Sequence, residues 1–336
     1  MAYTAIDDPS AYFKVQLYSG DGTAIGSGGQ VITFDDTDTD MQPDLVWVKC
    51  RSINNNHNMV DSVRGGGKKL APNSSYFEET KTEGIASFQS DGFTVGDYEN
   101  VNKSGETFVA WCWKESATAG FDIVSYTGNG TDDTDISHNL SAVPKMIIVK
   151  NRDATDSWQV YHSANTAAPE TDYQVLDEYG ATTDNVDRWS DEAPTSSVFT
   201  LGDGDEVNTD TEDYIAYCFA EKQGYSKFGS YTGNADADGP FVYTGFRPAF
   251  VLFKGNNTSD WQLWDNKRDP FNPVEKASHP DNVYVASTDQ DIDFLSNGFK
   301  IRGSVAHING DGVNFIYMAF AEAPLVNSNG VPCNAR

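Results

Sequence analysis

Four short sequence phrases occur three times along this chain, in the same order and at nearly the same spacing. A Tyr-(Ser/Thr)-Gly phrase comes first, then a proline followed by an apolar run ending in Lys, then a phrase centred on Phe, and last an aromatic phrase ending in Glu. They occupy residues 18–20, 43–49, 90–95 and 108–115, then 126–128, 144–150, 196–201 and 214–221, and finally 231–233, 248–254, 296–301 and 315–322. The prolines lie 101 and 104 residues apart. This period is longer than a solenoid unit of about 20 to 50 residues and is close to the size of a small domain.

The recurrence predicts three tandem copies of one domain or sub-domain. We place the copies at residues 12–116, 120–222 and 224–324, with an N-terminal arm at 1–11 and a C-terminal tail at 325–336. The joints between the copies are too short to act as flexible linkers. We therefore expect the copies to pack against one another.

Strand-forming signals dominate each third of the chain. The runs at 45–48, 145–149 and 250–253 are short, apolar and bounded by proline and polar turn residues, which is typical of central strands buried on both faces. Turn-forming pairs such as Asp91-Gly92 separate the strands. With 29 glycines and no long amphipathic helical window, an all-β fold is expected. Each copy is predicted to be an antiparallel β-sandwich or barrel of roughly six to eight strands.

The net charge is −27, from 50 acidic and 23 basic residues. It disfavours binding to nucleic acid or to an anionic membrane through a basic surface. No window approaches the 18 or more apolar residues of a membrane-spanning helix. The N-terminal residues lack the basic start and apolar stretch of a secretory signal, so we expect synthesis in the cytoplasm without export.

The four cysteines lie far apart and form no Cys-x-x-Cys pair, which argues against disulfides and zinc sites. Cys112 and Cys218 correspond to Ala319 in the recurring aromatic phrase. A position that accepts Cys or Ala is typical of a small buried packing site.

The sequence contains no recognisable catalytic constellation. The nucleophile-elbow, HExxH and Walker patterns are absent, and the five histidines are scattered. We therefore assign no catalytic residue and expect a protein that is not an enzyme. A glycosidase-type carboxylate pair stays open as an alternative, because spatial separation rather than sequence spacing defines it. The acidic residues considered for such a pair lie near Tyr173 and Trp189 in the sequence and are Asp177, Glu178, Asp184 and Asp187.

Oxygen-rich acidic turns are candidates for a cation site. Runs at residues 35–40, 132–135, 203–206 and 234–239 have the composition that wraps a hard cation such as Ca²⁺. The run at 234–239 begins like an EF-hand loop, but Gly245 stands where the closing glutamate belongs. A repeated acidic turn explains the runs equally, so no cofactor is assigned beyond a candidate Ca²⁺. The candidate ligands are Asn234, Asp236 and Asp238.

The segments between the recurring phrases differ in length, charge and aromatic content, and loops on a rigid scaffold often carry binding function. Trp158 and Trp261 lie at corresponding positions in a shared Trp-Gln phrase, which favours a role in the core. Aromatic side chains that do not recur are better candidates for stacking on a sugar. The candidate receptor or glycan contacts are Tyr173, Tyr179, Trp189 and Arg188.

Several phrases are similar to those of a repeat family found in predicted structural proteins of tailed phages, especially phages of marine bacteria and cyanobacteria. These phrases lie at 7–13, 42–49, 61–65, 90–93, 108–114 and 327–332. The resemblance covers nearly the whole chain and implies a virion component of the tail-fibre or virion-surface type. The family has no known function, so it brings no catalytic residues to this sequence.

The expected function is that of a non-enzymatic structural protein exposed on the surface of a virion. The expected role is that of a host-binding adhesin of the tail-fibre or head-spike type. The alternatives are a capsid decoration protein and a glycan-degrading, tailspike-like hydrolase. Expected partners are other virion proteins, reached through the N-terminal arm or the faces of the copies, a host surface glycan or protein, and further copies of the chain. Nucleic acid and membrane insertion are not expected. Three copies closed around an axis would suit a threefold site.

Overall fold

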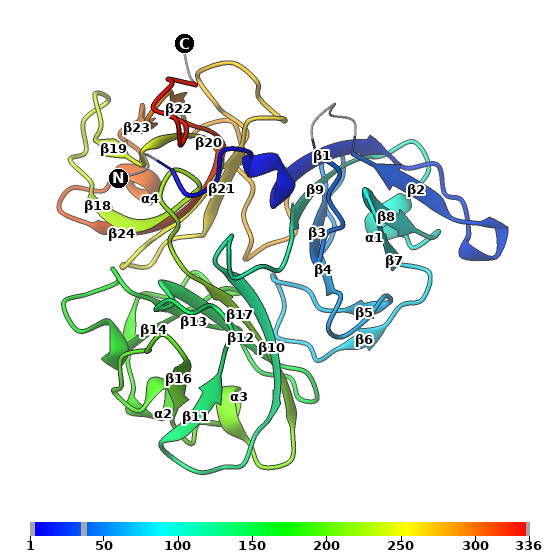
Figure 1. Cartoon of the computed structure of the whole chain (residues 1–336), viewed down its shortest axis with the longest axis horizontal. Coiled ribbons are helices and arrows are strands. Elements are labelled where there is room, and N and C mark those ends of the chain that lie inside the picture. Colours follow the sequence, from blue (N-terminus) through cyan, green and yellow to red (C-terminus); the bar gives the residue numbers. More distant parts are fainter. Residues whose placement is uncertain (1–3, 35–38, 334–336) are drawn as a thin grey trace.

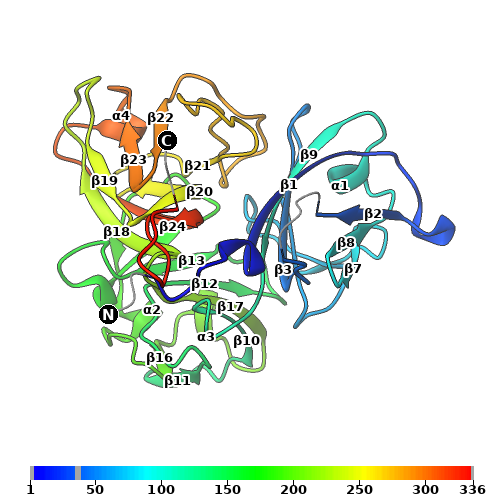
Figure 2. The same cartoon turned by 45° about the horizontal axis from the view of Figure 1, so that its top comes forward.

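The computed structural model describes residues 4–34 and 39–333. It is 40% strand and 8% helix, with antiparallel sheets, which confirms the prediction of an all-β fold. Figures 1 and 2 both show three lobes of strands around a common centre. Within the described residues, no helix has the length and apolar character needed to cross a membrane.

Each lobe contains one larger sheet. Sheet I consists, in spatial order, of β1 (Phe13–Ser19), β9 (Thr107–Trp113), β3 (Leu45–Cys50) and β4 (Asn58–Asp61). Sheet II consists of β10 (Phe121–Thr127), β17 (Asp213–Phe219), β12 (Met146–Asn151), β13 (Gln159–His162), β14 (Asp172–Val175) and β15 (Thr183–Asp184). Sheet III consists of β18 (Ser226–Thr232), β24 (Asn314–Pro324), β20 (Phe246–Gly255) and β21 (Gln262–Asp265). In all three, the aromatic strand that closes the lobe lies between the opening strand and the proline-led strand.

A smaller sheet accompanies each larger one. The smaller sheets are β2 (Gln30–Thr33), β8 (Gly92–Val95) and β7 (Ile85–Gln89), then β11 (Thr134–Ser137) and β16 (Val198–Leu201), then β19 (Phe241–Tyr243), β23 (Gly298–Ile301) and β22 (Ile292–Leu295). A ribbon of β5 (Lys68–Lys69) and β6 (Glu79–Thr80) lies beside sheet I. The helices are short: η1 (Pro9–Ala11), η2 (Ile25–Ser27), α1 (Glu99–Asn102), η3 (Pro169–Thr171), α2 (Val186–Trp189), α3 (Asp205–Asn208) and α4 (Ala306–Asn309).

The proline-led strands are covered on both faces, as their continuous apolar runs predict. Every residue of β3 and of β12 is buried. In β3, Val46 and Val48 join a hydrophobic cluster with the smaller sheet of their lobe, whereas Leu45 and Trp47 join a cluster at the centre of the molecule. Since both faces of the strand bury side chains, the sequence shows no alternation of polar and apolar residues.

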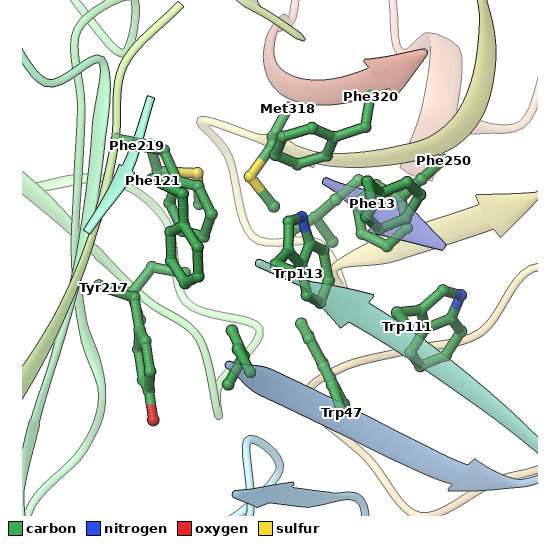
Figure 3. Close-up of a cluster of buried hydrophobic side chains, with 14 of the residues drawn as sticks. Phe13, Trp47, Trp111, Trp113, Phe121, Tyr217, Phe219, Phe250, Met318 and Phe320 are labelled. Atoms are coloured by element: carbon green, nitrogen blue, oxygen red, sulfur yellow. The ribbon is translucent and has the colours of Figure 1, made fainter. Parts of the chain in front are cut away.

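The central cluster contains side chains from all three larger sheets. Figure 3 shows its middle, where Trp113, Phe219 and Phe320 approach one another. Their ring centroids are 6.5 Å apart for Trp113 and Phe219, 5.8 Å for Trp113 and Phe320, and 6.0 Å for Phe219 and Phe320. Each of the three pairs with the first residue of the opening strand in its sheet. We refer to them as the aromatic triangle. Because the lobes share this core, they cannot separate without exposing it.

The Tyr-(Ser/Thr)-Gly phrase joins the opening strand to the short helix before the closing strand. The tyrosine hydroxyls of the three phrases donate to carbonyls in these helices, namely Tyr18 to Val101 O at 2.7 Å, Tyr126 to Val207 O at 2.8 Å and Tyr231 to Ile308 O at 2.8 Å. A buried asparagine at the end of each helix accepts a backbone N–H from the turn after the glycine. These bonds are Asp21 N–H to Asn102, Asn129 N–H to Asn208 and Asn234 N–H to Asn309.

The described part of the predicted N-terminal arm is folded onto the body of the molecule. Thr4 and Ile6 are buried, and the N–H of Ala5 donates to Gln223 O at 3.1 Å. The Asp7 carboxylate accepts the N–H of Ser328 at 2.6 Å. Residues 4–11 are therefore not a free arm, because their backbone and side chains already have partners within the chain.

All four cysteines are free. Cys50, Cys112 and Cys218 are buried and Cys333 is exposed. Cys112 and Cys218, like Ala319, lie wholly inside a lobe, which confirms the prediction of a small packing position.

Candidate functional site

Three loops join the lobes into a ring. We call residues 71–78 loop I, residues 175–182 loop II and residues 277–286 loop III. Each loop follows strands of one sheet and docks on the next, so loop I contacts sheet II, loop II contacts sheet III, and loop III contacts sheet I. The backbone hydrogen bonds at these junctions are Glu78 N–H to Arg152 O (2.9 Å), Thr182 N–H to Asn256 O (3.1 Å) and Asn55 N–H to Val283 O (2.9 Å).

A buried ring N–H donates to a loop carbonyl at each junction. The bonds are Trp158 Nε1 to Ala71 O at 3.1 Å, Trp261 Nε1 to Val175 O at 2.8 Å and His57 Nε2 to His279 O at 3.1 Å. Since the Trp47 indole donates to His57 Nδ1 at 2.9 Å, this network assigns the proton of the neutral imidazole to Nε2. Burial, and then the Lys49 charge, lower the pKa of His57 well below its usual value. The prediction that Trp158 and Trp261 are core residues is confirmed, because both are buried.

A buried lysine also stands at each junction. Lys49, Lys150 and Lys254 lie at corresponding positions of the proline-led strands and are almost fully buried. Their ammonium groups donate to backbone carbonyls, with Lys49 bound to Val283 O at 3.1 Å and Lys254 to Gly180 O at 2.8 Å. Burial lowers the pKa of each of the three to about 8. The three lysines thus satisfy carbonyls that water does not reach.

Two of the four predicted receptor contacts lie in the interior. Trp189 is 2% exposed and its ring lies 6.0 Å from that of Tyr161. Arg188 is 7% exposed, pairs with Glu206 at 2.7 Å and lies 5.1 Å from the ring of Tyr173. The structure corrects the prediction of an exposed patch for Trp189 and Arg188, because α2 turns both inward, where the indole gains hydrophobic burial. A buried ring cannot stack on a receptor.

The other two predicted contacts reach the surface to different degrees. Tyr173 is half-buried under Arg188. Tyr179, on loop II, is 63% exposed. Of the four residues, Tyr179 is therefore the one that the structure leaves available for contact.

The predicted cation ligands form a turn held by its own hydrogen bonds. Asn234 Oδ1 accepts the N–H of Asp236 at 3.0 Å, and Asp236 Oδ1 accepts the N–H of Asp238 at 2.9 Å. Lys300 pairs with Asp238 at 2.8 Å and lowers the pKa of that carboxyl. In the described part of the chain, no three His, Cys, Asp or Glu side chains are grouped to hold a metal ion. Residues 35–38 of the first acidic run lie outside the described residues.

The carboxylates named for the hydrolase alternative have separate surroundings. Asp177 accepts the N–H of Trp158 at 2.8 Å, and burial raises the pKa of Asp177 to about 6. Asn73 and Asp281 accept the corresponding N–H groups of the other two sheets, so Asp177 has a structural role. Asp184 and Asp187 are exposed, in β15 and α2 respectively, and Glu178 accepts the hydroxyl of Ser157 at 3.2 Å.

A hollow beside loop I gathers side chains of the kind that bind sugars. It has a volume of about 450 Å³ and is lined by Asn56, Lys69, Ala71, Ser74, Tyr76, Phe77, Glu79 and Tyr98. Tyr76 is 68% and Phe77 48% exposed. Exposed rings beside amide and charged groups can stack on a sugar face and bond its hydroxyls.

The polar side of this hollow is organised by one ion pair. Lys69 pairs with Glu79 at 2.6 Å, and its ammonium lies 5.9 Å from the ring centroid of Tyr98. The Lys69 hydrogen bond, the largest influence, lowers the pKa of Glu79 although burial opposes it. The carboxylate is therefore held ionised beside the exposed rings. We call this hollow, with Tyr76, Phe77, Tyr98, Lys69 and Glu79, the aromatic hollow.

The model of a family described as a domain of unknown function, DUF7483, matches residues 8–324. The chain belongs to the DUF7483 family. Among curated proteins and among solved structures, none matches the chain. The DUF7483 match spans all three lobes, so the family is defined by the whole body rather than by one lobe.

Sequence reasoning missed the aromatic hollow of this DUF7483 protein. Tyr76 and Phe77 stand in a short polar stretch and do not recur elsewhere in the chain, which is the signal that could have found them. Each loop also carries one strongly exposed tyrosine, since Tyr76, Tyr179 and Tyr284 are 68%, 63% and 60% exposed. The variable segments of the sequence contain all three loops, but the four residues predicted as contacts lie in the second of these segments alone.

Proposed function

We propose that the protein is a non-enzymatic component of a virion surface that binds a glycan of the host cell. The observation that carries this proposal is the aromatic hollow, in which Tyr76 and Phe77 are exposed beside the Lys69–Glu79 pair. The likeness of the recurring phrases to structural proteins of tailed phages supports a place on the virion. A loop that is already fixed by hydrogen bonds loses little conformational freedom on binding, which favours affinity.

The rigidity of loop I supports this role. Its backbone donates to Arg152 and accepts from the indole of Trp158, so the loop is held at both ends by sheet II. Tyr76 and Phe77 lie between these two anchors. A contact surface built this way keeps its shape when the ligand is absent.

The test uses the purified full chain with polysaccharide from the surface of candidate hosts. We expect direct binding by calorimetry and inhibition of phage adsorption when host cells are first incubated with the protein. The double variant Tyr76→Ala/Phe77→Ser is expected to bind at least about tenfold more weakly, because stacking contacts dominate such sites. Phe271→Ala, at a side chain 76% exposed outside the hollow, is the matched control and should bind normally. Adsorption that is unchanged at saturating protein would contradict the proposal.

We further propose that the three lobes are copies of one sandwich unit, at residues 12–116, 120–222 and 224–324, packed without flexible linkers. The common strand order of sheets I, II and III supports this interpretation. The corresponding registers of the aromatic triangle support it as well. Deleting any one unit should then leave the other two unable to bury the triangle, so a two-unit chain is expected to be insoluble or molten.

A capsid decoration protein is the second candidate. The arrangement of three lobes about the aromatic triangle favours it, because such a body would fit a threefold position of a shell. The copy number per particle separates the two candidates. A decoration protein would be present in many copies and its loss would lower capsid stability, whereas an adhesin would be present in few copies at the tail or at spikes.

A further inference from the structure

An internal ion pair seals the junction between loop I and sheet II. Arg152, which follows β12, donates from Nε to the Glu78 carboxylate at 3.0 Å and from a terminal nitrogen at 3.4 Å. Glu78 also accepts from the buried guanidinium of Arg64 at 3.1 Å. One loop carboxylate therefore contacts two arginines at this junction, of which Arg64 also pairs with Asp61 at 2.5 Å.

The junction between loop III and sheet I has an arginine, Arg51, at the position that corresponds to Arg152. Arg51 follows the buried Lys49 by two residues, as Arg152 follows the buried Lys150. Within the described residues, however, the Arg51 side chain has neither a hydrogen bond nor an ion pair, and only longer-range charges act on it. Burial, and then the Arg268 charge, lower the pKa of Arg51.

The carboxylate that should face Arg51 is missing from loop III. Glu78 stands five residues after Asn73, whose side chain caps the N–H of His57. Asp281 makes the corresponding cap to Trp261, and the residue five positions after it is Ala286. Loop III thus presents a methyl group at the place where loop I presents a carboxylate.

A pocket of about 250 Å³ lies between Arg51 and Ala286. Four of its lining residues are basic, namely Lys49, Arg51, Arg268 and Lys276, in a chain whose net charge is −27. Ser278, whose hydroxyl accepts a hydrogen bond from Arg268, and Thr288 belong to the same lining. Basic groups and hydroxyls in one small pocket form the donor set that binds an oxyanion.

The charges in the pocket are only partly balanced by the chain itself. Arg268 pairs with Asp265 at 2.5 Å, and Lys276 pairs with Asp269 at 2.5 Å. Lys49 donates to the uncharged carbonyls of Cys50 and Val283. In the part of the chain that the structure describes, Arg51 and Lys49 therefore form no ion pair with a carboxylate, although the charges of Asp265 and Asp269 act on Arg51 from a longer range.

We propose that this pocket binds a carboxylate-bearing ligand, whose oxyanion takes the place on Arg51 that the Glu78 carboxylate takes on Arg152. A guanidinium binds a carboxylate through two parallel hydrogen bonds, which gives both affinity and orientation. The pocket has room for one acidic sugar residue or one acidic amino-acid side chain. This site lies on loop III, so its test is independent of the test of the aromatic hollow on loop I.

The experiment measures binding of small carboxylates to the full chain by calorimetry and by the shift of thermal unfolding. The probes are D-glucuronate, N-acetylglutamate and, as the uncharged control, D-glucose. Ala286→Glu supplies the missing carboxylate from within the loop, and Arg51→Met removes the guanidinium. Thr182→Glu is the matched control, because it adds the same charge at the corresponding position of loop II, beside the neutral Asn256. Thr182→Gln accompanies it, because either change removes the hydrogen bonds of the Thr182 hydroxyl with Asn165 and Gln174.

We expect one or both carboxylates to bind and glucose not to bind. Ala286→Glu and Arg51→Met should each weaken binding by about tenfold or more, as the loss of a charged hydrogen bond predicts, while Thr182→Glu binds normally. Tighter binding of glucuronate would identify an acidic glycan as the source of the carboxylate, and tighter binding of N-acetylglutamate would identify a protein side chain. Binding that is equal in the wild type and in folded Ala286→Glu would overturn the proposal, as would the absence of binding to both carboxylates.

Discussion

The junction of loop I with sheet II and the junction of loop III with sheet I share their framework and differ in their charges. Both have a ring N–H bonded to a loop carbonyl, through Trp158 in one and His57 in the other. Only the first has a loop carboxylate, Glu78, on the arginine of the neighbouring sheet. The comparison separates two roles: uncharged donors and apolar packing hold each loop in place, whereas the ion pair decides whether the junction is closed or leaves a cationic pocket.

The largest expected effect comes from opening the closed junction. Glu78→Ala leaves Arg152 and the fully buried Arg64 without the carboxylate that both contact. Arg64 keeps its pair with Asp61 at 2.5 Å, so we expect a loss of about 2 kcal/mol in the free energy of unfolding at pH 7, from the charge-assisted hydrogen bonds that Glu78 makes to the two arginines. Urea unfolding followed by tryptophan fluorescence measures this loss.

The pH dependence of this loss follows from the pKa of Glu78. Burial tends to raise that pKa, but the arginine contacts outweigh it and the net shift is downward. A carboxyl whose pKa is lowered on folding contributes stability above its unfolded pKa of about 4.3, and this contribution is lost as the pH falls through the lower folded pKa. The stability difference between the wild type and Glu78→Ala should therefore shrink in acid. Glu99→Ala is the control, since that side chain is exposed, and it should change stability by less than about 0.5 kcal/mol. An equal loss in both variants would contradict the role given to Glu78.

Local patterns in the sequence predicted the framework but not the junctions. The apolar runs of β3 and β12 and the recurrence of Trp158 and Trp261 indicate burial, because a strand covered on both faces and a repeated ring need no long-range information. The pair formed by Glu78 and Arg152 joins residues 74 positions apart, and nothing near either residue indicates the partner. The docking of each loop on the next lobe depends on this long-range geometry.

The prediction that Trp189 contacts a receptor was wrong for a related reason. Because Trp189 does not recur, the sequence suggested a contact residue, but α2 packs against β16 and places the indole in the core of the lobe. Lack of recurrence could not tell a side chain that points outward from one that points inward. Tyr179 and Trp189 look alike in the sequence and differ only in the tertiary packing around them.

A smaller effect is expected at the loop side chain that accepts the backbone N–H of the buried His57 or Trp residue in each lobe. Asn73 accepts the N–H of His57 and donates to Asn56 at 2.8 Å. Asp281 accepts the N–H of Trp261 but lies near Asp260, and burial first, then that charge, raise the pKa of Asp281 to about 7. Asp281→Asn is therefore expected to stabilise the protein by about 1 kcal/mol at pH 8.

The sign of this effect reverses the usual behaviour of a carboxylate. A carboxyl whose pKa is raised on folding destabilises the fold above its folded pKa, and the penalty is relieved as the pH falls from about 7 toward the unfolded value near 4. The gain from Asp281→Asn should be clearly smaller at pH 5 than at pH 8 and should disappear near pH 4. Thermal unfolding at several pH values measures it. A gain that is the same at pH 5 and at pH 8 would show that the amide acts through packing rather than through charge.

The smallest effect is expected from closing the open junction. Ala286→Glu should place a carboxylate against Arg51, as Glu78 lies against Arg152, and should raise the free energy of unfolding by about 0.5 kcal/mol, the usual contribution of a partly exposed ion pair. Because salt screens such pairs, the gain should fall as ionic strength rises. Thr182→Glu lies beside Asn256 rather than beside an arginine, so it should be no more stable than Thr182→Gln. If Ala286→Glu instead destabilises the protein while Thr182→Glu is as stable as Thr182→Gln, the pocket beside Arg51 lacks room for a carboxylate, and the correspondence between loops I and III does not extend to their charges.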